Sequence, residues 1–174
     1  FTVEADWSQA AFWYAANFLD GEFDIPGLDH DSAQGDRRIA LDYWTLARPG
    51  EVELDVSQCP DLVPPLAAIA AGRSGVTRLT HAARLRMKES DRLTAVADVL
   101  TALGAEVAEG PDSLTLTGRD TLPGGAVVDS HNDHRIAMMA AVAALACEAP
   151  VTVTGAECVA KSYPNFWEDY EKLG

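Results

Sequence analysis

The chain has 174 residues, a hydrophobic fraction of 48% and a formal net charge of −14 at pH 7. Nucleic acids and anionic membranes attract basic surfaces, so neither is expected as a partner of so acidic a chain. No apolar run reaches the roughly 18 residues of a membrane-spanning helix, and the length suits one or two domains.

The chain opens with Phe1-Thr2-Val3-Glu4, a strand-like pattern without the features of a signal peptide. This opening suggests a fragment of a longer protein. The three cysteines are an odd number without C-x-x-C spacing, which favours a reduced, cytoplasmic protein. They are Cys59, Cys147 and Cys158, and Cys147 lies in an apolar run that predicts a core position.

Three apolar runs predict three helices. Each run begins at a residue that favours the N-cap of a helix, and each is apolar on nearly all faces, so the helices should be buried. The runs are Asp6 to Phe18, Asp61 to Ala71 and Asp133 to Ala146. The second places Pro64 and Pro65 in its first turn, where proline is tolerated.

Each apolar run is followed by a strand-like segment, a polar loop and a second, amphipathic helix. The predicted strands are 22–25, 76–80 and 151–154, and the loops begin at Gln34, Lys88 and Lys161. The distances along the chain from Asp6 to Gln34, from Asp61 to Lys88 and from Asp133 to Lys161 are nearly equal. The sequence therefore predicts an internal repeat.

Further strands are predicted in the middle of the chain. Gly104 is expected to end the second amphipathic helix, and 106–108 and 113–117 form a hairpin across Gly110-Pro111-Asp112. One more strand is predicted over 124–128. The fold class is therefore α/β, or α+β, with three helix-strand-helix-strand units around buried helices, at about 1–58, 59–129 and 130–174.

Three units in register would bring their loops and helix N-termini to one face. Helix N-termini favour anions, so a phosphorylated or carboxylated ligand is expected there. Six cations crowd into one stretch, and they form either a solvated face or part of this anion site. They are Arg73, Arg78, Arg84, Arg86, Lys88 and Arg92.

Three polar motifs stand at the starts of these elements. The segment 84–93 reads alone as a helix start capped by Ser90 or Asp91. The segment 131–138 holds His131 and His134, but no metal is expected because the spacing lacks the i, i+4 pair of a helical zinc site. The segment 160–167 reads alone as a loop whose Pro164 starts a helix.

Together the motifs resemble the EPSP synthase family. The resemblance covers Val3 to Ala11, Gln34-Gly35-Asp36, Lys88 to Arg92, Asn132 to Arg135 and Ala160 to Pro164, and so nearly the whole chain. It implies the enolpyruvyl transferase fold, with two domains of three units each, described as inside-out α/β barrels, and the active site between them. The chain would be the C-terminal domain, with the N-terminal domain absent.

The resemblance also implies a reaction. The 5-hydroxyl of shikimate 3-phosphate attacks phosphoenolpyruvate, and loss of phosphate from the tetrahedral intermediate gives the enolpyruvyl ether, without a metal or organic cofactor. Among the catalytic residues, Asp61 would accept the hydroxyl proton and Glu89 would protonate the methylene carbon. Lys161 would lie at the phosphate of phosphoenolpyruvate and relay a proton.

Four further residues are implied in substrate binding. Arg92 and Arg135 would grip the carboxylate of phosphoenolpyruvate, for which the planar guanidinium fork is suited. Lys88 would contact the shikimate hydroxyls. Arg84 would also contact substrate, at a position where relatives carry other polar residues.

The chain departs from the family pattern between Gln34 and Asp61, where it is shorter by about a hairpin, so the first unit should have an exposed edge. The chain would supply only one side of the cleft between the two domains, so we expect it to be inactive alone. Two alternatives stay open: a non-catalytic domain with a partial anion site, and the sister transferase that uses UDP-N-acetylglucosamine.

Overall fold

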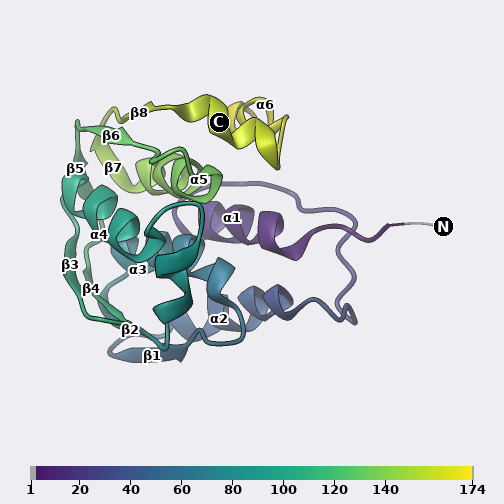
Figure 1. The fold of residues 1–174 in the computed structure, drawn as a ribbon, viewed down its shortest axis with the longest axis horizontal. Coiled ribbons are helices and arrows are strands. Elements are labelled where there is room, and N and C mark those ends of the chain that lie inside the picture. The colour runs from purple at the N-terminus through teal and green to yellow at the C-terminus, as the bar shows by residue number, and fades with distance from the viewer. Residues whose placement is uncertain (1–2, 174) are drawn as a thin grey trace.

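The computed structural model describes residues 3–173, which form six helices and eight strands (Figure 1). The helices are α1 (Trp7–Phe18), α2 (Ile39–Leu46), α3 (Val63–Gly72), α4 (Arg92–Ala102), α5 (His134–Ala143) and α6 (Phe166–Glu171). The strands are β1 (Val52–Asp55), β2 (Gly75–Thr80), β3 (Glu106–Glu109), β4 (Leu114–Gly118), β5 (Leu122–Gly124), β6 (Val127–Asp129), β7 (Cys147–Ala149) and β8 (Thr152–Thr154).

The three apolar helices α1, α3 and α5 pack on one another at the centre, as predicted. Every residue of α3 from Val63 to Ala71 is buried. Asp6 and Asp133 cap α1 and α5 by accepting hydrogen bonds from the backbone N–H groups of Ser8 and Arg135. The predicted cap at Asp61 is wrong, because this residue lies inside a 3-10 turn, Pro60–Leu62, and its oxygens bind basic side chains instead.

The strands cover the central helices on the outside. One sheet has the order β1-β2-β4-β3, in which β1 and β2 are parallel and β4 is antiparallel to both β2 and β3. Two smaller parallel pairs, β5 with β7 and β6 with β8, lie near α5 and α6. The predicted hairpin is confirmed as β3 and β4, and Gly104 follows α4 with a φ of +99°.

The region from β1 to α4 and the region from β6 to α6 share one local structure at a constant offset of 74 residues. Leu54 pairs with Leu79, and Val128 pairs with Val153. The hydroxyl of Thr80 donates to the carbonyl of Leu54, and that of Thr154 donates to the carbonyl of Val128. The next residues, His81 and Gly155, both have a left-handed backbone. Helices α4 and α6 then begin at Arg92 and Phe166, which are again 74 residues apart.

The predicted strand over 22–25 is wrong. Its segment is held instead by Phe23, which stacks on Trp13 with ring centroids 4.4 Å apart. In the second unit, β2 is a strand because β1 and β4 pair with its two edges. Within residues 3–58 no hairpin supplies such neighbours to segment 22–25, since α2 ends at Leu46 and β1 begins at Val52.

Other predictions needed correction. The single strand over 124–128 is two strands, β5 and β6, because Gly124 and Gly125 have φ angles of +66° and +70° that break the extended chain. Cys147 is half-buried in β7 rather than in the helical core. The opening strand falls partly on Phe1 and Thr2, outside the described residues, and Val3 and Glu4 are not in a strand. Strand β1 had not been predicted.

Between Val3 and Leu173, no helix combines the length and the apolar character that crossing a membrane requires.

Candidate functional site

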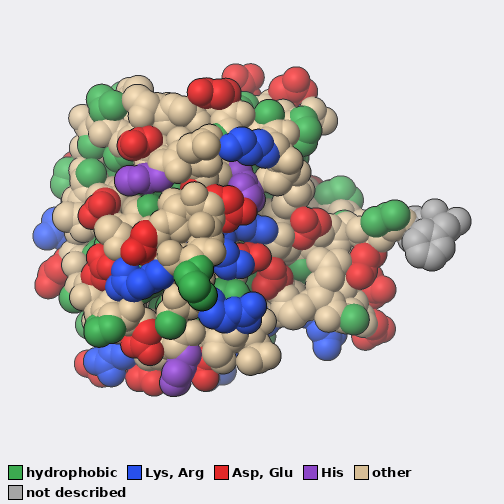
Figure 2. Space-filling model, in the orientation of Figure 1, with side chains coloured by type: hydrophobic (Ala, Val, Ile, Leu, Met, Phe, Trp, Pro, Cys, Tyr) green, Lys and Arg blue, Asp and Glu red, His purple; other side chains and the backbone are tan. Residues whose placement is uncertain are grey.

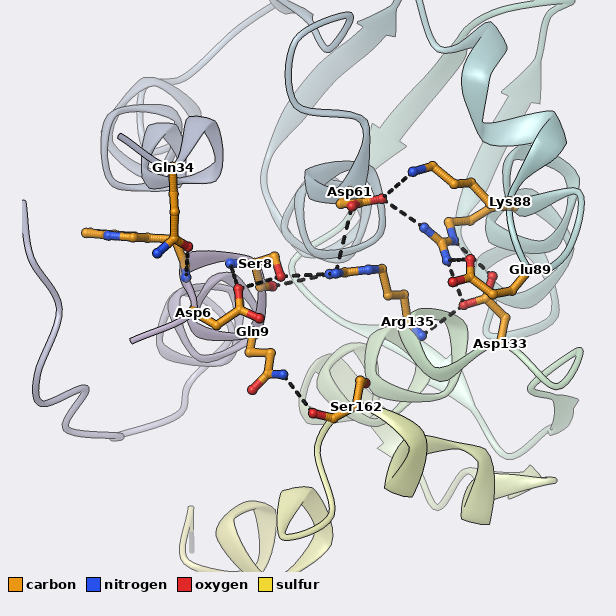
Figure 3. A network of polar contacts seen from close by, with 12 residues as sticks. Asp6, Ser8, Gln9, Gln34, Asp61, Lys88, Glu89, Asp133, Arg135 and Ser162 are labelled. Carbon is orange, nitrogen blue, oxygen red and sulfur yellow. Dashed lines mark hydrogen bonds and ion pairs between the residues drawn. The ribbon is translucent and has the colours of Figure 1, made fainter. Parts of the chain in front are cut away.

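The three predicted polar loops each contact the N-terminal end of the central helix of their own unit, and Figure 3 shows Gln34 and Lys88 at two of these contacts. The side chain of Gln34 accepts a hydrogen bond from the backbone N–H of Trp7 at 2.9 Å. Lys88 pairs with Asp61 at 3.0 Å, and Lys161 donates to the side chain of Asn132 at 2.9 Å. The repeat therefore gathers its polar loops around three helix starts.

Arg135 joins these helix starts to one another. Its guanidinium donates to the hydroxyl of Ser8 at 3.0 Å and lies 3.8 Å from a carboxylate oxygen of Asp61. The side-chain amide of Gln9 donates a hydrogen bond to the backbone carbonyl of Ser162, in the third polar loop, at 2.8 Å. The Arg135 side chain extends from the first turn of α5 and is 12% exposed, so its charge is mostly buried within the site.

Asp61 occupies the middle of this constellation, between Lys88 and Arg135 (Figure 3). Burial alone would raise its pKa, but the nearby charges of Arg135, Lys88 and Arg92 prevail and hold the pKa of the Asp61 carboxyl below its ordinary value. Its side chain is 30% exposed. Asp61 is therefore an ionised carboxylate at neutral pH and is partly open to a ligand.

Arg92 is the buried centre of a carboxylate network. Its side chain is 1% exposed and forms a two-pronged ion pair with Asp133, at 2.9 and 3.1 Å. It also donates to Asp61 at 3.1 Å and to Glu89. A guanidinium has five N–H groups, and these contacts occupy most of them. Arg92 is therefore placed to fix the acidic residues of the site.

Asp133 is fully buried and satisfies several donors at once. Besides Arg92, it accepts from the Ser90 hydroxyl at 2.9 Å and from the backbone N–H of Arg135 at 3.0 Å. Burial opposes its charge, but the hydrogen bonds and charge of Arg92 outweigh burial, and the pKa of Asp133 is lowered. This one side chain therefore caps α5 and neutralises Arg92.

The remaining predicted residues differ in their surroundings. Glu89 is half-exposed, with 50% of its side chain accessible, beside Arg92. Lys161 is exposed and reaches the constellation through Asn132. Arg84 is exposed and, among residues 3–173, it has neither an ion pair nor a side-chain hydrogen bond. The structure thus joins Asp61, Lys88, Glu89, Arg92 and Arg135 in one network, with Lys161 bound to Asn132 beside it and Arg84 apart from it.

The crowded cations between Arg73 and Arg92 turn out to have separate roles. Arg73 is buried and binds backbone carbonyls of Leu46, Arg48 and Gly50. Arg86 pairs with Asp91 and Glu109. Figure 2 shows Lys and Arg side chains near the middle of one face, bordered by acidic ones. The stretch is therefore neither one solvated face nor one anion site.

Three contributors to the site had not been assigned to it. Ser8 binds Arg135, and Asn132 binds Lys161. Burial and the charge of Asp61 raise the pKa of Asp36, which shows that Asp36 feels the charges of the same site. The repeat was the available signal for all three, because each stands near a helix start or a polar loop.

No set of three His, Cys, Asp or Glu side chains between Val3 and Leu173 has the arrangement of a metal site. The three cysteines are free thiols.

The lowered pKa of Asp133 predicts acid sensitivity of the fold. Folding lowers the pKa of the Asp133 carboxyl below the ordinary pKa of 3.8. The stability that this carboxyl contributes is therefore fully present above pH 3.8, and it is lost as the pH falls from 3.8 through the pKa of the folded state. The free energy of unfolding of the unchanged chain should therefore drop steeply below pH 3.8. In Asp133→Asn the drop should be shallower. Urea titrations between pH 7 and pH 2 test this, and parallel curves would contradict it.

Comparison with known proteins gives a consistent result. A family model described as "EPSP synthase (3-phosphoshikimate 1-carboxyvinyltransferase)" matches residues 1–170. A 3-phosphoshikimate 1-carboxyvinyltransferase of Clostridium acetobutylicum is 48% identical over 187 residues, covering 100% of this chain and 44% of the relative. One of Clostridium kluyveri is 47% identical, covering 99% and 44%. The chain thus spans less than half the length of these relatives.

Solved structures agree in fold. The structure of EPSP synthase from Acinetobacter baumannii matches with a TM-score of 0.86 at 26% identity, covering 99% of this chain and 46% of that one. The enolpyruvyl transferase NikO from Streptomyces tendae matches with a TM-score of 0.70 at 22% identity, covering 100% and 44%, which shows likeness of fold alone. The α/β fold class is therefore confirmed.

Proposed function

The chain belongs to the EPSP synthase family, and from this we propose that it is the C-terminal domain of a two-domain enzyme that transfers the enolpyruvyl group of phosphoenolpyruvate to the 5-hydroxyl of shikimate 3-phosphate. One observation supports the proposal most strongly. Asp61, Glu89, Arg92 and Arg135, which come from three separate motifs, form a single network on one face.

Proton transfer is assigned to the two accessible carboxyls. Asp61 is ionised and partly open, so it accepts the proton of the attacking hydroxyl, with Lys88 at 3.0 Å able to orient the same substrate group. Glu89 is more exposed and its carboxylate is fixed by Arg92, so Glu89 is the carboxyl that we assign to protonation of the methylene carbon. Both carboxyls bind the guanidinium of Arg92, which fixes their positions relative to each other.

Anion binding falls to Arg135 and Lys161 more than to Arg92. The Arg135 side chain keeps 12% of its area exposed, with part of its guanidinium engaged by Ser8, and it can offer its remaining N–H groups to a carboxylate. Lys161 is exposed and fits a phosphate group. Since carboxylates already occupy most of the N–H groups of Arg92, its contribution to substrate binding is to position Glu89 and Asp61.

The chain alone presents only one wall of the proposed cleft. Holding reactants in attack geometry contributes about 7–11 kcal/mol to lowering a barrier, and that contribution needs the other domain. The isolated chain is therefore a folded domain with a partial anion site. The sister transferase that takes UDP-N-acetylglucosamine remains the second candidate, and the lysine-bearing loops at Lys88 and Lys161 favour the shikimate acceptor.

Reconstitution tests the proposal. The chain is mixed with either the N-terminal or the C-terminal half of the Clostridium acetobutylicum relative, and phosphate release from phosphoenolpyruvate is measured with each acceptor. We expect release only with the N-terminal half and shikimate 3-phosphate, and none with the Glu89→Ala chain. Phosphate release with UDP-N-acetylglucosamine in place of shikimate 3-phosphate would reject the assigned acceptor. Phosphate release with the C-terminal half in place of the N-terminal half would reject the assignment of this chain as the C-terminal domain.

A further inference from the structure

The two lysines that the repeat places in equivalent loops bind different kinds of partner. In the second unit, Lys88 forms an ion pair with the carboxylate of Asp61 at 3.0 Å. In the third unit, Lys161 donates to the side-chain amide oxygen of Asn132 at 2.9 Å, and within residues 3–173 it forms no ion pair with a carboxylate. The chain itself therefore compensates the charge of Lys88 and leaves the charge of Lys161 uncompensated.

The carboxylate that the repeat would place beside Lys161 is engaged elsewhere. Asp133 is the equivalent of Asp61, since each precedes a central helix of its unit. Asp133 is fully buried, and its two oxygens bind the guanidinium of Arg92 at 2.9 and 3.1 Å. The preceding residue, Asn132, contacts the lysine instead. A neutral amide thus takes the part that a carboxylate has in the second unit.

The backbone before α5 fixes the position of Asn132. His131 and Asn132 have φ angles of +54° and +53°, in the left-handed region that asparagine tolerates better than most side chains. The backbone N–H of Asn132 donates to the hydroxyl oxygen of Ser130 at 3.3 Å, and that hydroxyl donates to the carbonyl of Gly155 at 3.1 Å. Residues held in such sparsely populated conformations concentrate at functional sites.

The chemistry of the contact determines which end of the Asn132 amide faces Lys161. An ammonium has three N–H groups and accepts no hydrogen bond, so the amide oxygen must face it. Between Val3 and Leu173 the amide nitrogen of Asn132 has no hydrogen-bond acceptor, and both side chains are exposed. The amide N–H groups of Asn132 and the remaining N–H groups of Lys161 are therefore free to donate to an anion.

We propose that Asn132 is a positioning residue for Lys161, which fixes the ammonium through a neutral acceptor and keeps its whole positive charge for the phosphate group of a ligand. A carboxylate at this place would fix the ammonium equally well, but it would cancel the charge and repel the anion. The inference rests on the proposed function in that the phosphate group is that of phosphoenolpyruvate.

Two substitutions separate the hydrogen bond from the charge. Asn132→Asp keeps the size, the acceptor and the tolerance of a left-handed backbone, but it adds a negative charge beside Lys161. Asn132→Gly removes the acceptor and adopts the same backbone without strain. A backbone role alone would leave both variants like the unchanged chain, and a need for any acceptor would make Asn132→Gly the weaker binder.

Binding of inorganic phosphate to the chain alone is the first measurement, followed by the backbone amide NMR signals of residues 130–135. We expect the dissociation constant to rise about tenfold or more in Asn132→Asp, because the added charge opposes the anion. In Asn132→Gly it should rise by less. Asn165→Asp is the matched control, since it adds the same charge at an exposed asparagine whose side chain does not cap α6, and its dissociation constant should not change. Urea unfolding shows that each variant is folded.

The KM for phosphoenolpyruvate is the second measurement, made with the chain assembled with an N-terminal half. It should be highest in Asn132→Asp, intermediate in Asn132→Gly and lowest in the unchanged chain. A KM for Asn132→Asp at or below that for Asn132→Gly would show that neutrality of the acceptor is unimportant and would overturn the proposal. Failure of the unchanged chain to bind phosphate would overturn it as well.

The two measurements keep this inference apart from the proposed function. The expected order of phosphate binding, in an assembly that releases no phosphate from phosphoenolpyruvate, would support the role of Asn132 and reject the proposed reaction. Phosphate release that continues with equal KM in all three chains would support the reaction and reject the role of Asn132.

Discussion

Replacing Arg92 with Ala should lower the free energy of unfolding by about 3–5 kcal/mol, the cost of leaving a buried charge without its partner. Asp133 is fully buried, and its bonds to Arg92 are the main compensation for its charge. Domains are stable by only about 5–15 kcal/mol, so this loss would leave the chain close to unfolding. Urea unfolding at pH 7, followed by tryptophan fluorescence, measures it.

The matched control is Arg84→Ala, on an exposed arginine eight residues earlier, which should change stability by less than about 0.5 kcal/mol. The double variant Arg92→Met with Asp133→Asn removes both charges and should recover part of the loss. If Arg92→Ala were as stable as Arg84→Ala, the network would not be a stabilising element and the positioning role of Arg92 would have to be abandoned.

Replacing Asp61 with Asn should lower kcat of the assembled enzyme by about 10²–10⁴-fold, the range for loss of a positioned acid or base. Asn keeps the size of the side chain and an oxygen for Lys88 and Arg92, but it cannot accept the hydroxyl proton. Stopped-flow phosphate release at saturating substrates measures kcat, and urea unfolding of the same variant shows whether the fold is retained.

Asp98→Asn is the control, because Asp98 is an exposed aspartate on the outer side of α4. Its kcat should equal that of the unchanged enzyme. A kcat for Asp61→Asn within threefold of the unchanged value, in a folded assembly, would show that another group accepts the proton.

The central helices could be predicted from sequence because their signals are local. Apolar runs on every face, preceded by Asp6 and Asp133, determine both the burial and the first turns of α1 and α5. Strands were less predictable, because a strand needs a neighbour. The segment 22–25 has the composition of a strand and fails to form one without partners, whereas β1 forms because β2 pairs with it.

In the site, too, the features with local signals could be predicted and those that depend on tertiary packing could not. Motifs identified which residues gather, and the repeat indicated that helix starts would meet on one face. Sequence could not show that Asp133, 41 positions from Arg92, would bind two N–H groups of its guanidinium. A buried ion pair of this kind depends on how α4 and α5 pack, and its two members carry no local pattern that joins them.

The most direct test of the divided active site is the initial rate of phosphate release from phosphoenolpyruvate and shikimate 3-phosphate, measured first with this chain alone and then with an N-terminal half added. We expect no release above the Glu89→Ala control from the chain alone, and sustained release from the mixture. Turnover by the chain alone would show that its own residues form a complete active site and would contradict the account.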